Sequence, residues 1–302
     1  MEKLKLALDW TPNINHIGFF VARELGFYSE LGLALEISSP ATDEYQLTPA
    51  KKVELGQADF ALCPMESVLS YRTKDNAFDL KAIAAIFKED LSAIVTMKNS
   101  GISFPGLLDG KSYASYQARY EDEIVKQMII NDGGKGDIEV IYPPKLGIWE
   151  TIVNGDFDAT WIFMNWEGVQ AKSKGLELNT FKMSDYKVPY SYSPVIAASE
   201  KQISARLDAY RKFLNATKRG FLAALEAPEQ AASILSSEVA ATDQDIDLLL
   251  AIDSSKKALG DQASWGIMDS GNVQEYLDWI YQHQLEQRKV SVEDLVTNKL
   301  LA

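Results

Sequence analysis

Short apolar runs alternate with segments of helical spacing over residues 1–90, and this alternation restricts the possible folds more than any other feature. The first run, "KLKLALDW", predicts a buried strand, and apolar residues then recur at helical spacing over residues 17–25. Further strands are predicted by "LALEIS", "ADFALCP", "LKAIAAIF" and "LSAIVTM", and helices by "YQLTPAKKVELGQ" and "MESVLSYRTK". Strands that alternate with helices form a mostly parallel sheet with helices on both faces, so we expect an α/β fold.

The same pattern starts again after "SFPGLLDGK" and ends near "VPYSYSPVIAAS", which is extended and rich in β-forming residues. From Glu200 onward the spacing of apolar residues is almost entirely helical. We therefore expect two lobes, with residues 1–90 as the first part of lobe 1, 91–187 as lobe 2, and 188–302 as the return to lobe 1 with the C-terminal helices. No proline-rich linker separates the lobes, so strands join them, as in proteins that hinge around a cleft.

The composition indicates a folded protein and excludes several functions. Of the 302 residues, 46% are hydrophobic, which is enough for a large core. The formal net charge of −13 argues against nucleic acid and anionic membranes as partners, because their phosphates would be repelled. The single cysteine, Cys63, rules out an intramolecular disulfide and any multi-cysteine metal site, and only His16 and His283 accompany it. We expect no bound metal.

The expected compartment depends on the native start of the chain. The opening "MEKLKLALDW" lacks the long apolar stretch of a signal peptide, and no run reaches the roughly 18 apolar residues of a membrane span. We expect a cytoplasmic protein if Met1 is the native start. If a signal peptide was removed, we expect a periplasmic or cell-surface protein.

The turn "DWTPNINH" is unusually rich in polar and aromatic residues for a strand-to-helix connection. In an open parallel sheet, ligands bind beyond the carboxyl ends of the strands, where the next helix presents unpaired N–H groups. Trp10 offers a flat apolar face, Asn13 offers hydrogen bonds, and Asn15 is the expected N-cap of a helix that starts near His16. A purely structural role, with Trp10 in the core and His16 on the surface, is the alternative.

The segment "LALDWTPNINHIGFFVARELGFYSELGLALEI" resembles the opening of the thiamine-pyrimidine-precursor branch of the type II periplasmic-binding-protein superfamily. The shared features are the D/N-W-x-P turn, the histidine before the helix and the "G-F/Y-Y/F-x-E-x-G-L" segment. Looser matches at "VELGQADFALCPMESVL", "LLDGKSYASY", "VNGDFDATWIF" and "YSYSPVIAAS" extend the resemblance over most of residues 3–220. It implies two α/β lobes, two strand crossings near 88–98 and 186–197, a ligand between the lobes and a helical C-terminus.

That branch contains both formylaminopyrimidine-binding components of ABC importers and fungal enzymes that build the aminopyrimidine phosphate of thiamine. In the resemblance, Cys63 stands where the enzymes have a lysine that binds pyridoxal phosphate, and Ser67 where they have a histidine. Their glycine-rich phosphate turn corresponds to "SYQARYEDE", which lacks glycine, and their cysteine-rich motif to "VPYSYSP", which lacks cysteine. These departures argue against the enzymatic chemistry, and no other catalytic motif is present, so we predict a protein that is not an enzyme and holds no cofactor.

A small heteroaromatic ligand needs flat partners and a few directional polar groups. Trp10 is the expected stacking partner in lobe 1, and Tyr190 and Tyr192 alternate on the return strand so that both face one side. An ordinary amphipathic strand is the alternative for this pair. Because Trp161 and Trp166 have an odd spacing, only one of them faces the cleft, and the other lies in the core.

The predicted carboxylate contacts lie at strand ends. Glu66 or Glu167 could make a bidentate contact with an aminopyrimidine, accepting hydrogen bonds from its ring nitrogen and from its exocyclic amine. Alternatively, each could act only as a first-turn carboxylate that the helix dipole favours. Arg119 could receive a carboxylate or formyl oxygen, or lie in solvent. The full set of predicted ligand-binding residues is Trp10, Asn13, His16, Glu66, Tyr116, Arg119, Trp161, Glu167, Tyr190 and Tyr192.

The sequence thus predicts a solute-binding protein that closes on a small heteroaromatic ligand. The resemblance favours a thiamine-precursor aminopyrimidine and implies ABC-type import or salvage, with an ABC permease as a partner. The alternatives are another small organic solute, such as a sulfonate, an amino acid or an aromatic acid, or a thiamine-pyrimidine biosynthetic enzyme.

Overall fold

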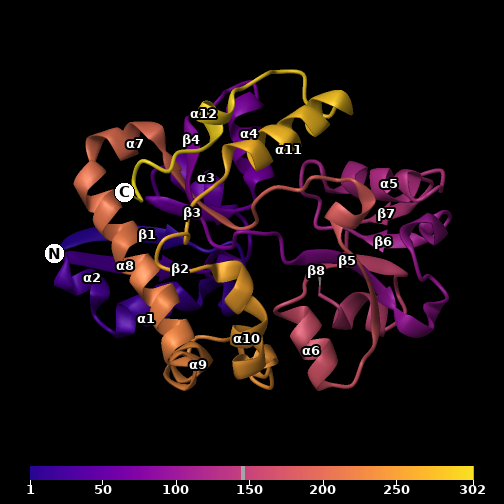
Figure 1. Cartoon of the computed structure of the whole chain (residues 1–302), viewed down its shortest axis with the longest axis horizontal. Coiled ribbons are helices and arrows are strands. Elements are labelled where there is room, and N and C mark those ends of the chain that lie inside the picture. Colours follow the sequence, from indigo (N-terminus) through magenta and orange to yellow (C-terminus); the bar gives the residue numbers. More distant parts are fainter. Residues whose placement is uncertain (144–146, 302) are drawn as a thin grey trace. The chain divides into compact units, whose positions relative to one another are not determined.

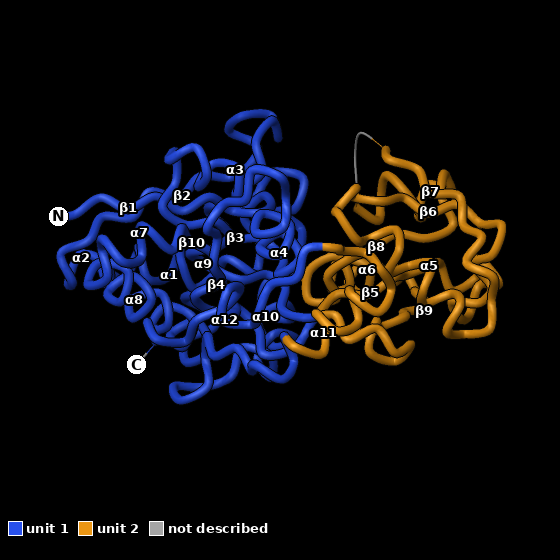
Figure 2. The backbone as a smooth tube through the Cα atoms, turned by 90° about the horizontal axis from the view of Figure 1, so that it is seen from above, with its two compact units in different colours: residues 1–90, 191–273, 288–302 blue, residues 91–190, 274–287 orange. Residues whose placement is uncertain are grey.

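The computed structural model describes residues 1–143 and 147–301, which divide into two units (Figure 2). Unit 1 consists of residues 1–90, 191–273 and 288–302, and unit 2 of residues 91–190 and 274–287. The borders after residues 90 and 190 fall at the predicted strand crossings. Residues 274–287, which we had assigned to the return to lobe 1, instead group with unit 2, because a helical pattern does not tell which sheet a helix covers.

Unit 1 is built on a five-stranded sheet in the order β2-β1-β3-β10-β4 (Figure 1). Strand β1 pairs in parallel with β2 and β3, whereas β10 pairs antiparallel with β3 and β4. The strands are β1 (Glu2–Ala7), β2 (Leu33–Ser38), β3 (Phe60–Cys63), β4 (Leu80–Ala85) and β10 (Val195–Ser199).

Helices from three stretches of the chain belong to unit 1. The N-terminal ones are η1 (Ile14–His16), α1 (Ile17–Glu24), α2 (Phe27–Glu30), α3 (Pro49–Glu54) and α4 (Met65–Thr73). The later ones are α7 (Glu200–Ala205), α8 (Leu207–Glu226), α9 (Pro228–Ser236), α10 (Leu248–Leu259) and α12 (Val292–Leu295). Helix α11 (Ser270–Gln282) starts in unit 1 and continues in unit 2.

Aromatic packing and close helix contact hold unit 1 together. The rings of Phe60 on β3 and Phe213 on α8 stack with centroids 3.9 Å apart. Helices α1 and α8 approach closely because Gly220 has no side chain: a Cβ there would lie 2.0 Å from the carbonyl oxygen of Gly18. A methyl group at this point would force the two helices apart.

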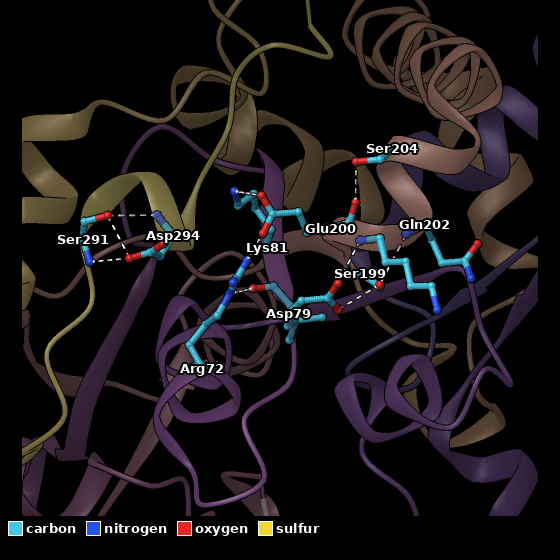
Figure 3. A network of polar contacts seen from close by, with 11 residues as sticks. Arg72, Asp79, Lys81, Ser199, Glu200, Gln202, Ser204, Ser291 and Asp294 are labelled. Atoms are coloured by element: carbon cyan, nitrogen blue, oxygen red, sulfur yellow. Dashed lines mark hydrogen bonds and ion pairs between the residues drawn. The ribbon is translucent and has the colours of Figure 1, made fainter.

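A polar network joins α4, β4 and the start of α7 (Figure 3). Glu200 accepts from Arg72 at 2.9 Å and from Lys81 at 2.6 Å. Beside it, Asp79 accepts from the Ser199 hydroxyl at 2.9 Å and from the backbone N–H of Lys201 at 2.8 Å. These bonds fasten the end of β10 and the start of α7 to α4 and to the chain around the start of β4.

Unit 2 has a second five-stranded sheet in the order β7-β6-β8-β5-β9. Strand β6 pairs in parallel with β7 and β8, and β5 pairs antiparallel with β8 and β9. Its elements are β5 (Ser92–Met97), β6 (Ser112–Ala114), β7 (Glu139–Ile141), β8 (Ala159–Phe163), β9 (Leu178–Phe181), α5 (Glu121–Asn131), α6 (Glu167–Ser173) and a π-helical turn (Trp149–Val153).

The two-lobed α/β fold is as predicted, with one difference in strand direction. Both sheets are mixed rather than mostly parallel, because β5 and β10, the first strands after the chain changes unit, run against their neighbours. Within the parts of the chain that the structure describes, no helix is both long and apolar enough to cross a membrane.

Candidate functional site

The turn between β1 and α1 is capped by Asn13 and not by the predicted Asn15. Asn13 has an extended backbone, and its side-chain oxygen accepts the N–H of Asn15 at 2.9 Å, so it opens η1. Helix α1 follows directly from Ile17. Our prediction was wrong because a short 3₁₀ turn precedes the α-helix, which moves the cap two residues earlier.

His16 lies at the centre of this turn and is fully buried. Its Nδ1 accepts the backbone N–H of Asn13 at 3.1 Å, and its Nε2 lies 2.8 Å from Oδ1 of Asp9. Because Nδ1 is an acceptor, the ring proton sits on Nε2 and is donated to the Asp9 carboxylate. Both ring nitrogens are therefore engaged inside the turn, and His16 holds Asp9 and the following Trp10 in place.

Asp9 is a residue that the sequence reasoning did not select, although it belongs to the D/N-W-x-P motif. It lies two residues after Ala7, the buried end of β1, and 22% of its side chain is exposed. The bond from His16 occupies one carboxylate oxygen. Asp9 is thus a fixed, partly exposed carboxylate next to Trp10, which is the geometry that a ligand amine requires.

Trp10 is half-buried and contacts Tyr45, with ring centroids 5.6 Å apart and planes inclined at 57°. Tyr45 lies in the segment after β2, and the residue is 51% exposed. Both Tyr45 and the preceding Glu44 have positive φ, 62° and 54°, which is an unfavourable conformation for residues with side chains. Burial raises the pKa of Tyr45, and the Asp243 carboxylate raises it further. The loop therefore holds an exposed aromatic ring against Trp10.

The carboxyl end of β3 adds Cys63 and Glu66 to the same edge of the sheet, since β3 pairs in parallel with β1. Both residues are buried. Burial raises the pKa of the Cys63 thiol, and the carboxylates of Asp9 and Glu66 raise it further. A thiol in this setting stays protonated and is a poor nucleophile.

Tyr190 and Tyr192 do not share one face of a strand, so that prediction was wrong. Strand β10 begins only at Val195, and the two tyrosines precede it in irregular chain. Tyr192 is buried in unit 1, where its hydroxyl accepts the N–H of Asp269 at 2.8 Å. Tyr190 belongs to unit 2 and packs there against other aromatic rings.

The aromatic cluster of unit 2 contains Trp161, Tyr190 and Tyr276. Tyr190 makes edge-on contacts with the other two, with ring centroids 5.1 Å from Trp161 and 5.8 Å from Tyr276. Trp161 is half-buried on β8, whereas Trp166 is 3% exposed and lies in the core. Of the two tryptophans with odd spacing, Trp161 is therefore the one available to a ligand.

Two turns at the carboxyl edge of the unit 2 sheet bring Tyr116 and Glu167 together. They follow β6 and β8, which are parallel neighbours. Burial raises the pKa of Tyr116 strongly, and the Glu167 carboxylate is the next largest cause, before that of Glu121. One oxygen of Glu167 accepts the N–H of Phe163 at 3.0 Å and so closes the turn.

Arg119 is exposed at the surface, as one of the two possibilities left open by the sequence has it, and it is ion-paired there. Its guanidinium donates to Glu286 at 2.6 Å, and the hydroxyl of Tyr120 donates to the same oxygen at 3.1 Å. The carboxylate of Glu286 neutralises its charge. Among residues 1–143 and 147–301, no group of three or more His, Cys, Asp or Glu side chains is arranged to hold a metal ion.

The chain is similar to two kinds of known protein. The formylaminopyrimidine-binding protein of Halalkalibacterium halodurans is 25% identical over 308 residues, which span 97% of this chain and 89% of that protein. A 4-amino-5-hydroxymethyl-2-methylpyrimidine phosphate synthase of Legionella pneumophila is 31% identical, but over only 102 residues, 34% of this chain and 31% of the synthase.

Solved structures share the fold at low identity. A Candida albicans protein described as having the generic periplasmic binding protein fold superposes with a TM-score of 0.72 at 15% identity, covering 99% of this chain and 97% of its own. The ligand-binding component of an ABC-type import system from Staphylococcus aureus gives 0.71 at 15% identity, covering 100% and 98%. The fold is that of the periplasmic binding proteins. The sequence pattern of the family described as NMT1/THI5 like matches residues 13–231, and the chain therefore belongs to that family.

Proposed function

We propose that this protein is a solute-binding protein whose ligand is a small heteroaromatic molecule, namely an aminopyrimidine related to thiamine precursors. The observation that carries the proposal is the buried turn at the carboxyl end of β1, where His16 fixes a partly exposed carboxylate, Asp9, beside Trp10. A carboxylate next to a flat ring matches an aminopyrimidine, which presents polar hydrogens at its edge and a π-face.

Unit 2 supplies the same two kinds of group. Trp161 and Tyr190 form an aromatic surface, and Glu167 and Tyr116 lie at the carboxyl ends of β8 and β6. The similarity to a formylaminopyrimidine-binding protein along 97% of the chain supports this ligand class. Two or three aromatic contacts plus a carboxylate are enough for micromolar affinity, about 8 kcal/mol.

The biological setting that we propose is ABC-type import, with a permease as the partner that receives the ligand. A structural neighbour from Staphylococcus aureus is a component of such a system. In this setting the protein works in the periplasm or at the cell surface.

An enzymatic role is less well supported by the site. The relatives named as pyrimidine phosphate synthases match only about a third of the chain. Cys63, in the position that the resemblance assigns to their lysine, is a buried thiol and cannot form the imine with a carbonyl cofactor that a lysine forms. We therefore propose binding without turnover.

A thermal-shift panel tests the ligand class. It contains formylaminopyrimidine, hydroxymethylpyrimidine, thiamine, pyridoxal phosphate, alkanesulfonates and amino acids. A ligand at a hundred times its dissociation constant stabilises the folded state by about 2.7 kcal/mol, which is a shift of several degrees. A response confined to the pyrimidines supports the proposal, whereas a response confined to sulfonates or amino acids refutes the proposed ligand.

A further inference from the structure

The turn between β6 and α5 has the form of an anion-binding loop, but a side chain of the protein fills it. The backbone N–H groups of Tyr116 and Ala118 donate to the two carboxylate oxygens of Glu121, at 3.0 Å and 3.1 Å. The N–H between them, of Gln117, donates to the Ser115 hydroxyl at 3.0 Å. Gln117 has φ 61°, the left-handed conformation that lets successive N–H groups converge.

Glu121 is firmly held in this position. Only 2% of the residue is exposed, and the hydroxyl of Tyr113 donates to one of its oxygens at 2.6 Å. Three donors face the carboxylate, so it takes the place of the anion that such a turn at a helix N-terminus otherwise attracts. Burial raises the pKa of Glu121, and the hydrogen bonds from Tyr113, Tyr116 and Ala118 oppose this effect.

The surrounding charges are also negative. The first turn of α5 contains Glu121, Asp122 and Glu123. Asp122 accepts from the hydroxyls of Ser115 and Tyr142, each at 2.7 Å, and so remains beside the turn. A phosphate at this place would have to displace a buried carboxylate and then lie against like charges, which is strongly unfavourable.

The turn lies among the unit 2 residues that the proposed function assigns to the ligand. Tyr116 is part of it, and the Glu167 carboxylate at the end of the neighbouring strand is close enough to raise the pKa of Tyr116. A ligand group reaching the carboxyl edge of this sheet therefore meets the Glu121 turn.

We propose that Glu121 is a specificity-determining residue: its carboxylate occupies the anion position of the turn and thereby excludes ligands that carry a phosphate monoester. This inference rests on the proposed function, which it deepens by limiting the ligand to unphosphorylated molecules.

Calorimetric titration of hydroxymethylpyrimidine and of its phosphate monoester tests the inference. Wild-type protein should bind the alcohol on the order of 100-fold more tightly than the phosphate. Glu121→Gln frees a backbone N–H and removes the charge, so it should reduce this ratio to about 10-fold or less. Glu123→Gln, the matched control, removes the same charge from the same helical turn, but Glu123 is exposed and pairs with Lys126 instead of the turn, so the ratio should persist.

Glu121→Asp keeps the charge and should also keep the discrimination, and it serves if the glutamine variant melts at a much lower temperature. Equal affinity of the wild-type protein for both ligands overturns the inference and leaves the proposed function intact. Equal changes in the Glu121→Gln and Glu123→Gln variants also overturn it, since they indicate a general charge effect. If neither pyrimidine binds the wild-type protein, the proposed function fails, and the inference fails with it.

Discussion

Replacing His16 by leucine should destabilise unit 1 and loosen the proposed binding turn. Leucine fills a similar volume but leaves the backbone N–H of Asn13 without its acceptor, and Asn13 is 4% exposed. A buried unsatisfied N–H costs about 1–3 kcal/mol. The Asp9 carboxylate also loses a donor, but its side chain is 22% exposed and water replaces much of that bond. The two effects together lower the free energy of unfolding by about 3 kcal/mol.

Urea unfolding followed by circular dichroism measures this change, and His283→Leu is the matched control. His283 is half-buried, and its ring lies 4.6 Å from that of Trp279, so its loss should change stability by less than about 1 kcal/mol. Nitrogen NMR of the wild-type protein should show His16 with its proton on Nε2. A proton on Nδ1, or equal effects of the two substitutions, would refute the assigned role of His16.

Three further predictions concern other parts of unit 1. Tyr45→Ala should weaken pyrimidine binding about 5–10-fold in calorimetry, because one aromatic contact is worth about 0.5–1.5 kcal/mol, and Tyr45→Phe should not; equal losses would contradict a stacking role. Gly220→Ala should lower the free energy of unfolding by about 1–3 kcal/mol in urea, since its Cβ would meet the Gly18 carbonyl oxygen; an unchanged midpoint would contradict the close helix contact. Lys81 and Arg72 lower the pKa of Glu200, so its stabilisation is present above the unfolded-state pKa of about 4.3 and is lost as the pH falls through the lower folded-state value. Glu200→Gln should therefore destabilise by less than about 1 kcal/mol at pH 7, and the difference from wild type should vanish in melts below that pKa range.

The periodicity of the sequence was sufficient for most of the fold. Alternating apolar runs located β1, β2 and β3, because buried strands between helices need continuous apolar sequence. The direction of β5 and β10 could not be predicted in the same way, since a buried strand has the same composition whether its neighbours run parallel or antiparallel to it. Long-range topology decides that direction.

The candidate site was only partly predictable. Trp10 and Glu66 were selected because they follow strand ends, and their positions there are determined locally. Tyr45 was missed because its approach to Trp10 depends on two consecutive left-handed residues, which no local propensity favours. Glu121 was missed because its role comes from backbone N–H groups in a turn, and these leave no trace in residue type.

The central claim is that the Asp9–Trp10 turn binds a small aminopyrimidine. Calorimetric titration of formylaminopyrimidine into wild-type protein, Trp10→Ala and Phe27→Ala tests it most directly. Phe27 is a half-buried aromatic residue on α2, and its ring packs beneath Arg219. Helix α2 precedes the amino-terminal end of β2, the end opposite to the proposed binding turn. We expect one ligand per chain with micromolar affinity for wild type and Phe27→Ala, and a loss of about tenfold or more for Trp10→Ala. The absence of binding to wild type, or equal affinity in all three proteins, would contradict the account.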